Sequence, residues 1–115
     1  MCFMKTRHLS FLFYLFACLR FSLSVVNFSY PISEEAWAYY WVAVSYSKDG
    51  DFDAAAEQYK QAILLEPNFA EAHAALGSVY QIKGLFGDAI SELKKAINID
   101  PTFAKAYTNL GLIYS

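Results

Sequence analysis

The sequence predicts an all-α fold, an α-solenoid of antiparallel helix pairs preceded by an apolar N-terminal segment, on the basis of three observations. The segment AEAHAALGSVY at residues 70–80 returns 34 residues later as AKAYTNLGLIY, and a weaker version stands at 36–46. Apolar and small residues within these segments recur at the spacing of an amphipathic helix. Glycine and proline separate the helical stretches at matching places. A fixed period of this length is typical of a stacked repeat array.

Residues 36–69 and 70–103 form two complete repeats, and residues 104–115 begin a third. We therefore divide the chain into an N-terminal segment, 1–31, and a repeat array, 32–115. The two complete repeats are identical at eleven positions. In the first repeat these positions are Ala36, Ala38, Tyr46, Gly50, Phe52, Ala55, Lys60, Ala62, Ile63, Pro67 and Phe69.

The first helix of each complete repeat is predicted over 35–47 and 70–82. Gly50 and Gly84 follow these helices, and glycine readily adopts the left-handed conformation that ends a helix. The residues expected to face the core are Tyr39, Val42, Ala43 and Tyr46 in one repeat and His73, Leu76, Gly77 and Tyr80 in the next.

The second helices are predicted over 53–65 and 87–99, and each is followed by a proline that cannot continue the helix. Their core-facing residues are Ala55, Tyr59, Ala62, Ala89, Leu93 and Ala96. We expect Asn68 to cap the next first helix, with Glu71 as its reciprocal acid.

Small residues recur where the first helix of a repeat should cross the second. Ala43, Gly77 and Gly111 occupy this position in the three repeats. Glycine inside a helix costs up to about 1 kcal/mol relative to alanine, so its recurrence there indicates close packing. One helix pair still leaves an apolar face uncovered, and the next pair covers it.

These spacings resemble the tetratricopeptide repeat. The resemblance covers residues 36–115, and His73 and Val42 depart mildly from the usual aromatic and leucine. It implies a right-handed superhelix of helix pairs, whose inner surface is lined by the first helices and binds peptides or partner proteins.

The candidate partner-binding groove is the face of each first helix opposite the packing stripe. Its residues are Trp37, Tyr40, Trp41, Val44, Glu71, Ala74, Ala75, Ser78, Lys105, Thr108, Asn109 and Leu112. Because Trp and Tyr dominate interface energetics, we expect Trp37, Tyr40 and Trp41 to anchor the partner. Alternatively, the N-terminal segment or a preceding repeat covers these three side chains.

Two known kinds of tetratricopeptide groove fit the sequence poorly. A clamp for C-terminal carboxylates needs basic and asparagine side chains; Lys105 matches one such place, but the others hold Tyr40, Val44, Ala75 and Asn109. Asn109 also resembles the asparagine ladder of O-linked N-acetylglucosamine transferases, but Trp41 and Ala75 interrupt that ladder.

The function predicted from the repeats is a protein-interaction scaffold that is not an enzyme and needs no cofactor. The alternative is the truncated repeat region of a larger enzyme, such as an O-linked N-acetylglucosamine-type glycosyltransferase. No metal site is expected. Asp49, Asp51 and Asp53 have the spacing that opens a calcium loop, but Ala54 and Lys60 replace its essential glycine and glutamate.

The charge of the array argues against a nucleic-acid partner. From residue 34 onward the chain carries six lysines and eleven acidic residues, 6 − 11 = −5. Binding to phosphates needs clustered basic side chains.

The N-terminal segment has the layout of an export signal, with Lys5 and Arg7 before an apolar run at 9–19. We expect export or membrane anchoring rather than a cytoplasmic location. The alternatives are cleavage after Ser24, lipidation of Cys18, association with a membrane through residues 9–30, and a start placed too early. Arg20 would cost about 2.5–3.5 kcal/mol at the centre of a membrane span.

The third repeat stops after its first helix, which presents Leu110 and Tyr114 to a second helix that this sequence does not contain. We therefore expect self-association through this edge.

Overall fold

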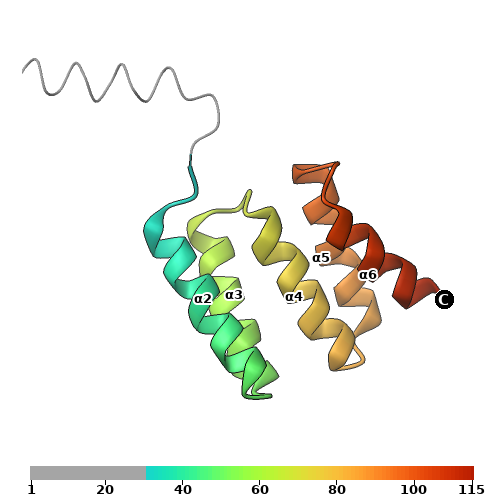
Figure 1. Cartoon of the computed structure of the whole chain (residues 1–115), viewed down its shortest axis with the longest axis horizontal. Coiled ribbons are helices and arrows are strands. Elements are labelled where there is room, and N and C mark those ends of the chain that lie inside the picture. Colours follow the sequence, from blue (N-terminus) through green and yellow to red (C-terminus); the bar gives the residue numbers. More distant parts are fainter. Residues whose placement is uncertain (1–30) are drawn as a thin grey trace, which may run out of the picture. The chain divides into compact units, whose positions relative to one another are not determined.

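The computed structural model describes residues 31–115, and every regular element in this part is an α-helix. The helices are α2 (Glu34–Lys48), α3 (Phe52–Leu65), α4 (Ala70–Ile82), α5 (Phe86–Ile99) and α6 (Ala104–Tyr114). Residues Ile32–Ser115 pack as one compact unit. Figure 1 shows two helix hairpins, α2–α3 and α4–α5, followed by α6. The predicted all-α solenoid is confirmed in this part, and each predicted helix boundary lies within one residue of the observed one.

The expectations of a cleaved signal, a lipidated Cys18, a membrane anchor at 9–30 and a misplaced start concern residues 1–30, which lie outside the described residues. Within residues 31–115, none of the helices has the length and apolar character that crossing a membrane requires.

Each hairpin turns at a glycine with a positive φ angle, +82° at Gly50 and +78° at Gly84. After α2, the backbone N–H of Gly50 donates to Ser47 O and that of Asp51 donates to Tyr46 O. Gly84 and Leu85 make the same two bonds after α4. This pair of bonds is the Schellman motif, which satisfies the last carbonyls of a helix. The left-handed conformation predicted for Gly50 and Gly84 at the ends of these helices is confirmed.

The core lies between successive helices. α2 packs on α3 and α4 on α5 within the hairpins, while α3–α4 and α5–α6 contacts join one repeat to the next. The core-facing residues predicted on the second helices are all buried. A Cβ added at Gly77 would lie 2.9 Å from Leu93 Cγ and 3.2 Å from Ala89 O. The predicted close approach of α4 and α5 at Gly77 is therefore confirmed.

The predicted stripe of the first helix is only partly buried. Ala43 is fully buried, but Val42 is 45% exposed, whereas Leu76, at the same position of the next repeat, is 3% exposed. Leu76 packs in a cluster with Tyr59 of α3. No described helix covers the corresponding face of α2. The expectation that Val42 and Tyr46 are core residues is therefore wrong.

The start of α4 also differs from the sequence prediction. Its N-cap is Phe69, which makes no side-chain hydrogen bond, so the predicted cap by Asn68 and Glu71 is wrong. The ring of Phe69 is fully buried, with its centroid 4.7 Å from that of Trp37 and 5.5 Å from that of Tyr40. Burial of this ring, rather than a polar cap, fixes where α4 begins.

The N-cap of α5 offers a stability test. At the N-cap of α3, Asp51 Oδ1 accepts a hydrogen bond from Ala54 N at 3.1 Å, whereas Leu85, at the equivalent place, caps nothing. The variant Leu85→Asn is expected to be more stable than the control Leu85→Ala by about 0.5–2 kcal/mol, because only asparagine can satisfy a free helical N–H. Chemical denaturation of both variants measures this difference, and equal stability would contradict it.

Candidate partner-binding groove

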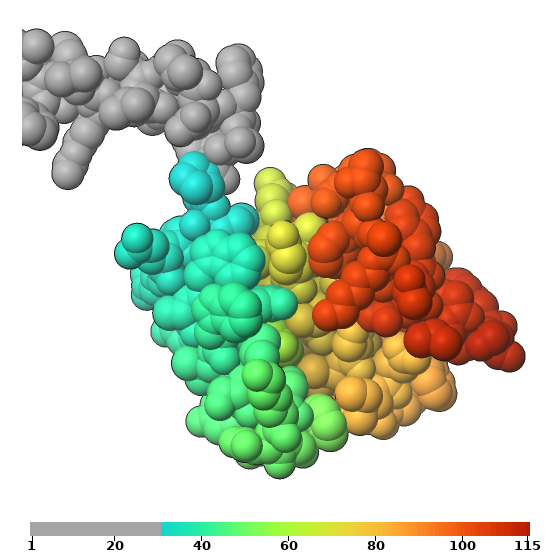
Figure 2. All heavy atoms as spheres, in the orientation of Figure 1, coloured from blue at the N-terminus to red at the C-terminus, as the bar shows by residue number. Residues whose placement is uncertain are grey.

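A hollow of about 300 Å³ opens on the face formed by the first helices. Figure 2 shows this face, with α4 (yellow to light orange) visible between α2 (cyan to green) and α6 (red). The hollow is lined by Tyr40, Trp41, Val44, Ser47, Phe52, Tyr59, Ala75, Ser78, Val79, Ile82 and Lys105. Apart from Lys105, these residues come from α2, α3 and α4, so the hollow lies mainly within and between the first two repeats.

Aromatic side chains of α2 form one wall of the hollow. The rings of Trp37 and Trp41 stack with centroids 6.1 Å apart, and Tyr40 meets Trp41 edge-on at 5.2 Å. Trp37 and Tyr40 are partly buried because they pack on Phe69, whereas Trp41 is 60% exposed. Trp41 therefore offers contact area, and the rings behind it hold it in place.

The side of α4 that faces the hollow carries two small residues, Ala75 and Ser78, beside Val79 and Ile82. Ala75 is buried and Ser78 is partly buried, which leaves room for a bound chain close to the helix. Ala74 packs instead with Leu93 and Ala106 and has almost no exposed surface.

A polar link joins α4 to α6 beside the hollow. Asn109 Nδ2 donates to Ser78 Oγ at 2.7 Å, and Ser78 Oγ donates to Ala74 O at 3.1 Å. The amide N–H of Asn109 that makes this link is therefore engaged inside the protein. Lys105 is the one lining residue of the hollow that comes from α6.

Lys105 is the one charged side chain among the residues that line the hollow. Burial raises the pKa of the Tyr40 hydroxyl, and the nearby Tyr59 and Glu71 raise it further. Burial likewise raises the pKa of Tyr59. Both phenols stay neutral at physiological pH, so the aromatic wall itself adds no charge to the hollow.

The hollow brings together Tyr40, Trp41, Val44, Ala75, Ser78 and Lys105 from the residues predicted as the groove. The predicted residues outside its lining are Trp37, Glu71, Ala74, Thr108, Asn109 and Leu112. The sequence interpretation missed the contribution of α3, which supplies Phe52 and Tyr59. Phenylalanine recurs at positions 52 and 86, and this recurrence was the sequence signal that could have indicated a role for Phe52.

The acidic residues with calcium-loop spacing have other structural roles. Asp51 caps α3, and Asp53 pairs with Lys83 of the next hairpin turn. That hydrogen bond and the lysine charge hold the pKa of Asp53 below its usual value. Within residues 31–115, no group of three or more His, Cys, Asp or Glu side chains could hold a metal ion.

Comparison with known proteins gives one family. A family model described as TPR repeat matches residues 45–84 and 82–115, more than half of the chain. A comparison with curated proteins gave no match.

Several solved structures share the fold. MamA is 35% identical with a TM-score of 0.68, and the match covers 70% of this chain and 47% of MamA. The second TPR domain of human RPAP3, solved with the HSP70 peptide SGPTIEEVD, is 25% identical with a TM-score of 0.68, over 70% of this chain and 68% of that one. The Cut9–Hcn1 structure is 30% identical with a TM-score of 0.67, over 70% of this chain and 15% of that one. The chain thus spans just under half the length of MamA.

Proposed function

Because this chain belongs to the tetratricopeptide-repeat family, we propose that it is a scaffold that binds a segment of a partner protein in the hollow between α2 and α4. The observation that carries this proposal is Trp41, a large aromatic side chain that is 60% exposed at the edge of the hollow. An exposed tryptophan supported by packed rings is a typical binding hot spot. The scaffold acts by binding, not by catalysis.

The shape and charge of the hollow suggest what the partner segment presents. An apolar side chain of the partner would lie against Trp41 and Tyr40, while its backbone passes the small side chains of α4. An acidic group on the partner would pair with Lys105. The hollow contains a single cation. It therefore lacks the several basic side chains that bind a chain-terminal carboxylate tightly.

One of the solved structures supports this proposal through the ligand that it holds. The RPAP3 domain binds a short peptide, and it has the same fold at 25% identity. The alternative of a glycosyltransferase region gains no support from the structures compared above.

The experiment is selection of binding peptides from a displayed random library on the 115-residue chain. The selected peptides are then titrated against Trp41→Ala and against Val42→Ala, a neighbouring control on a different face of α2. Loss of the indole should weaken binding roughly tenfold or more, which corresponds to about 1.4 kcal/mol. Val42→Ala should bind as the unmodified chain does. Peptides that bind Trp41→Ala undiminished, or a selection that enriches none, would overturn the proposal.

A further inference from the structure

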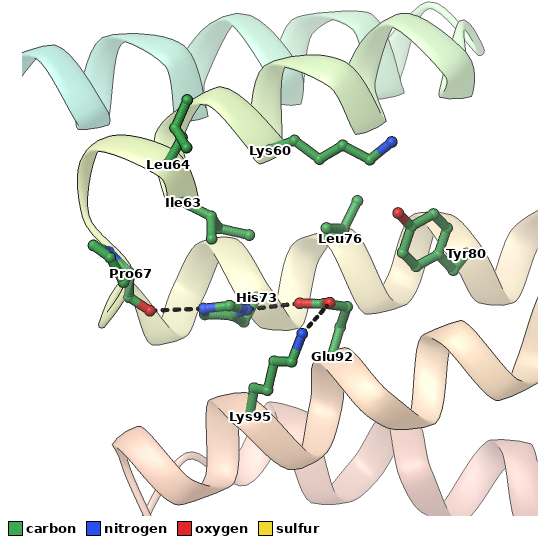
Figure 3. A pocket seen from close by; sticks show the side chains of 9 residues that line it. All are labelled: Lys60, Ile63, Leu64, Pro67, His73, Leu76, Tyr80, Glu92 and Lys95. Carbon is green, nitrogen blue, oxygen red and sulfur yellow. Dashed lines mark hydrogen bonds and ion pairs between the residues drawn. The ribbon is translucent and has the colours of Figure 1, made fainter.

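A second hollow of about 410 Å³ lies between α3, α5 and a different face of α4. Figure 3 shows His73 of α4 at its base, between Pro67 of the turn that joins the two repeats and Glu92 of α5. His73 is 5% exposed and is the one polar or charged residue among the buried residues of the described part. This arrangement has no role in the proposed partner-binding groove.

Both ring nitrogens of His73 face hydrogen-bond acceptors. Nε2 lies 2.8 Å from the carbonyl oxygen of Pro67, and Nδ1 lies 2.6 Å from Glu92 Oε2. A carbonyl oxygen carries no proton, so Nε2 must donate the first bond. A neutral imidazole has only one N–H, and its other nitrogen would then point a lone pair at a carboxylate oxygen.

Glu92 is held in its ionised form. Burial by itself would raise the pKa of Glu92, but hydrogen bonds from His73 and Lys95 outweigh burial and lower that pKa. Lys95 Nζ donates to Glu92 Oε1 at 2.9 Å, which leaves Oε2 to accept from the imidazole. Independently of His73, the ammonium of Lys95 on Oε1 favours the carboxylate form of Glu92, whose Oε2 can only accept, and this geometry calls for an N–H on Nδ1 as well.

We propose that His73 is a buried imidazolium that donates a hydrogen bond from each ring nitrogen. These two bonds, called the His73 tie below, connect the turn between the repeats to α5, and they depend on pH. When the ring loses one proton, one of the two bonds is replaced by a contact between lone pairs. The turn at Pro67 or the helix at Glu92 then loses its connection to α4.

The other repeats show which part of this tie is general. Tyr107 stands 34 residues after His73, and its hydroxyl donates to Pro101 O at 3.1 Å. In the first repeat, Tyr39 and Gln58 occupy the places of His73 and Glu92. In the third repeat, a neutral tyrosine thus donates the equivalent hydrogen bond to the proline carbonyl. The pair of a histidine with a glutamate is a feature of the second repeat.

The charges around His73 fix the direction of the pH effect. Lys60, Lys95 and Tyr80 also line the hollow, and the two lysines oppose a further positive charge. Each lysine is paired with a glutamate, Lys60 with Glu57 and Lys95 with Glu92, while Glu92 contacts the imidazole directly at 2.6 Å. Because the proposed imidazolium donates both bonds, the stability that these bonds contribute is lost as the pH rises. On the acidic side, the lowered pKa of Glu92 means that its contribution is lost as the pH falls.

Nitrogen-15 NMR of the full-length chain tests the protonation state directly. The His73 signals are assigned by their absence in His73→Tyr. At pH 7 both ring nitrogens are expected to show a bonded proton, and in Glu92→Gln one of the two N–H signals is expected to be lost. A ring with a single N–H in the unmodified chain at pH 7 would overturn the proposal, whatever the stability of the variants.

Thermal unfolding against pH tests the consequence. The matched control is the double variant H73Y/E92Q. It gives the second repeat the tyrosine and glutamine that the first repeat has as Tyr39 and Gln58. Between about pH 6 and about pH 9 the unmodified chain is expected to lose several degrees more in Tm than the double variant. His8 is present in both chains and cancels in the comparison. The same pH dependence in the two chains would count against the tie.

Discussion

Replacing Phe69 with alanine is expected to destabilise the chain by about 3–5 kcal/mol, the usual cost of removing a fully buried aromatic ring. Phe69 is among the largest side chains that are completely buried, and it lies where the first repeat meets the second. Its ring contacts Trp37 and Tyr40 of α2, and Phe69 is also the N-cap residue of α4. Because small domains are stable by only about 5–15 kcal/mol, this one substitution should remove a large part of the total.

Urea denaturation followed by circular dichroism measures the loss. Phe103 stands 34 residues later and provides the matched control, since it is only partly buried. Phe103→Ala is expected to cost about 1–2 kcal/mol, within the ordinary range for a single substitution. Equal losses in the two variants would contradict the assignment of Phe69 to the centre of the contact between repeats.

The substitution Gly77→Ala is expected to destabilise the chain even though alanine favours helices. The new Cβ would lie 2.9 Å from Leu93 Cγ and 3.2 Å from the backbone oxygen of Ala89. Leu93 is fully buried and has little room to move. Overpacking of this kind costs about 1–3 kcal/mol. This cost exceeds the gain of up to about 1 kcal/mol in helix propensity.

Gly111→Ala, the same substitution at the equivalent place in α6, should have the opposite sign. No atom lies within 4 Å of a Cβ added there, so only the gain in helix propensity remains, about 0.5–1 kcal/mol. Each variant adds one methyl group, and the two differ in whether side-chain or backbone atoms of a second helix lie close to it. If both variants proved more stable than the unmodified chain, the close packing of α4 on α5 would be wrong.

Most of the helix positions could be predicted from the sequence because local chemistry determines them. Gly50 and Gly84 occupy the left-handed positions after α2 and α4, and no other described residue needs a positive φ angle. Pro67 and Pro101 follow α3 and α5 closely. The repeat period then gives the order of packing, because each helix pair must bury the face of its neighbour.

The features that the sequence did not predict depend on contacts between distant residues. Asn68 has the right chemistry for a cap, but the burial of Phe69 decides where α4 starts. Val42 matches the core pattern, and only the arrangement of the helices shows that its face is uncovered. His73 and Glu92 are 19 residues apart on different helices, and no sequence motif joins a histidine to an acid at that separation.

The stacked pair on α2 has a practical consequence. Trp37 and Trp41 are the two tryptophans of the whole chain, and their rings lie 6.1 Å apart. Intrinsic fluorescence excited at the red edge of the indole absorption therefore comes from a single small region beside the hollow. The chain carries a built-in optical reporter there, so occupancy of the hollow can be followed without attaching a dye.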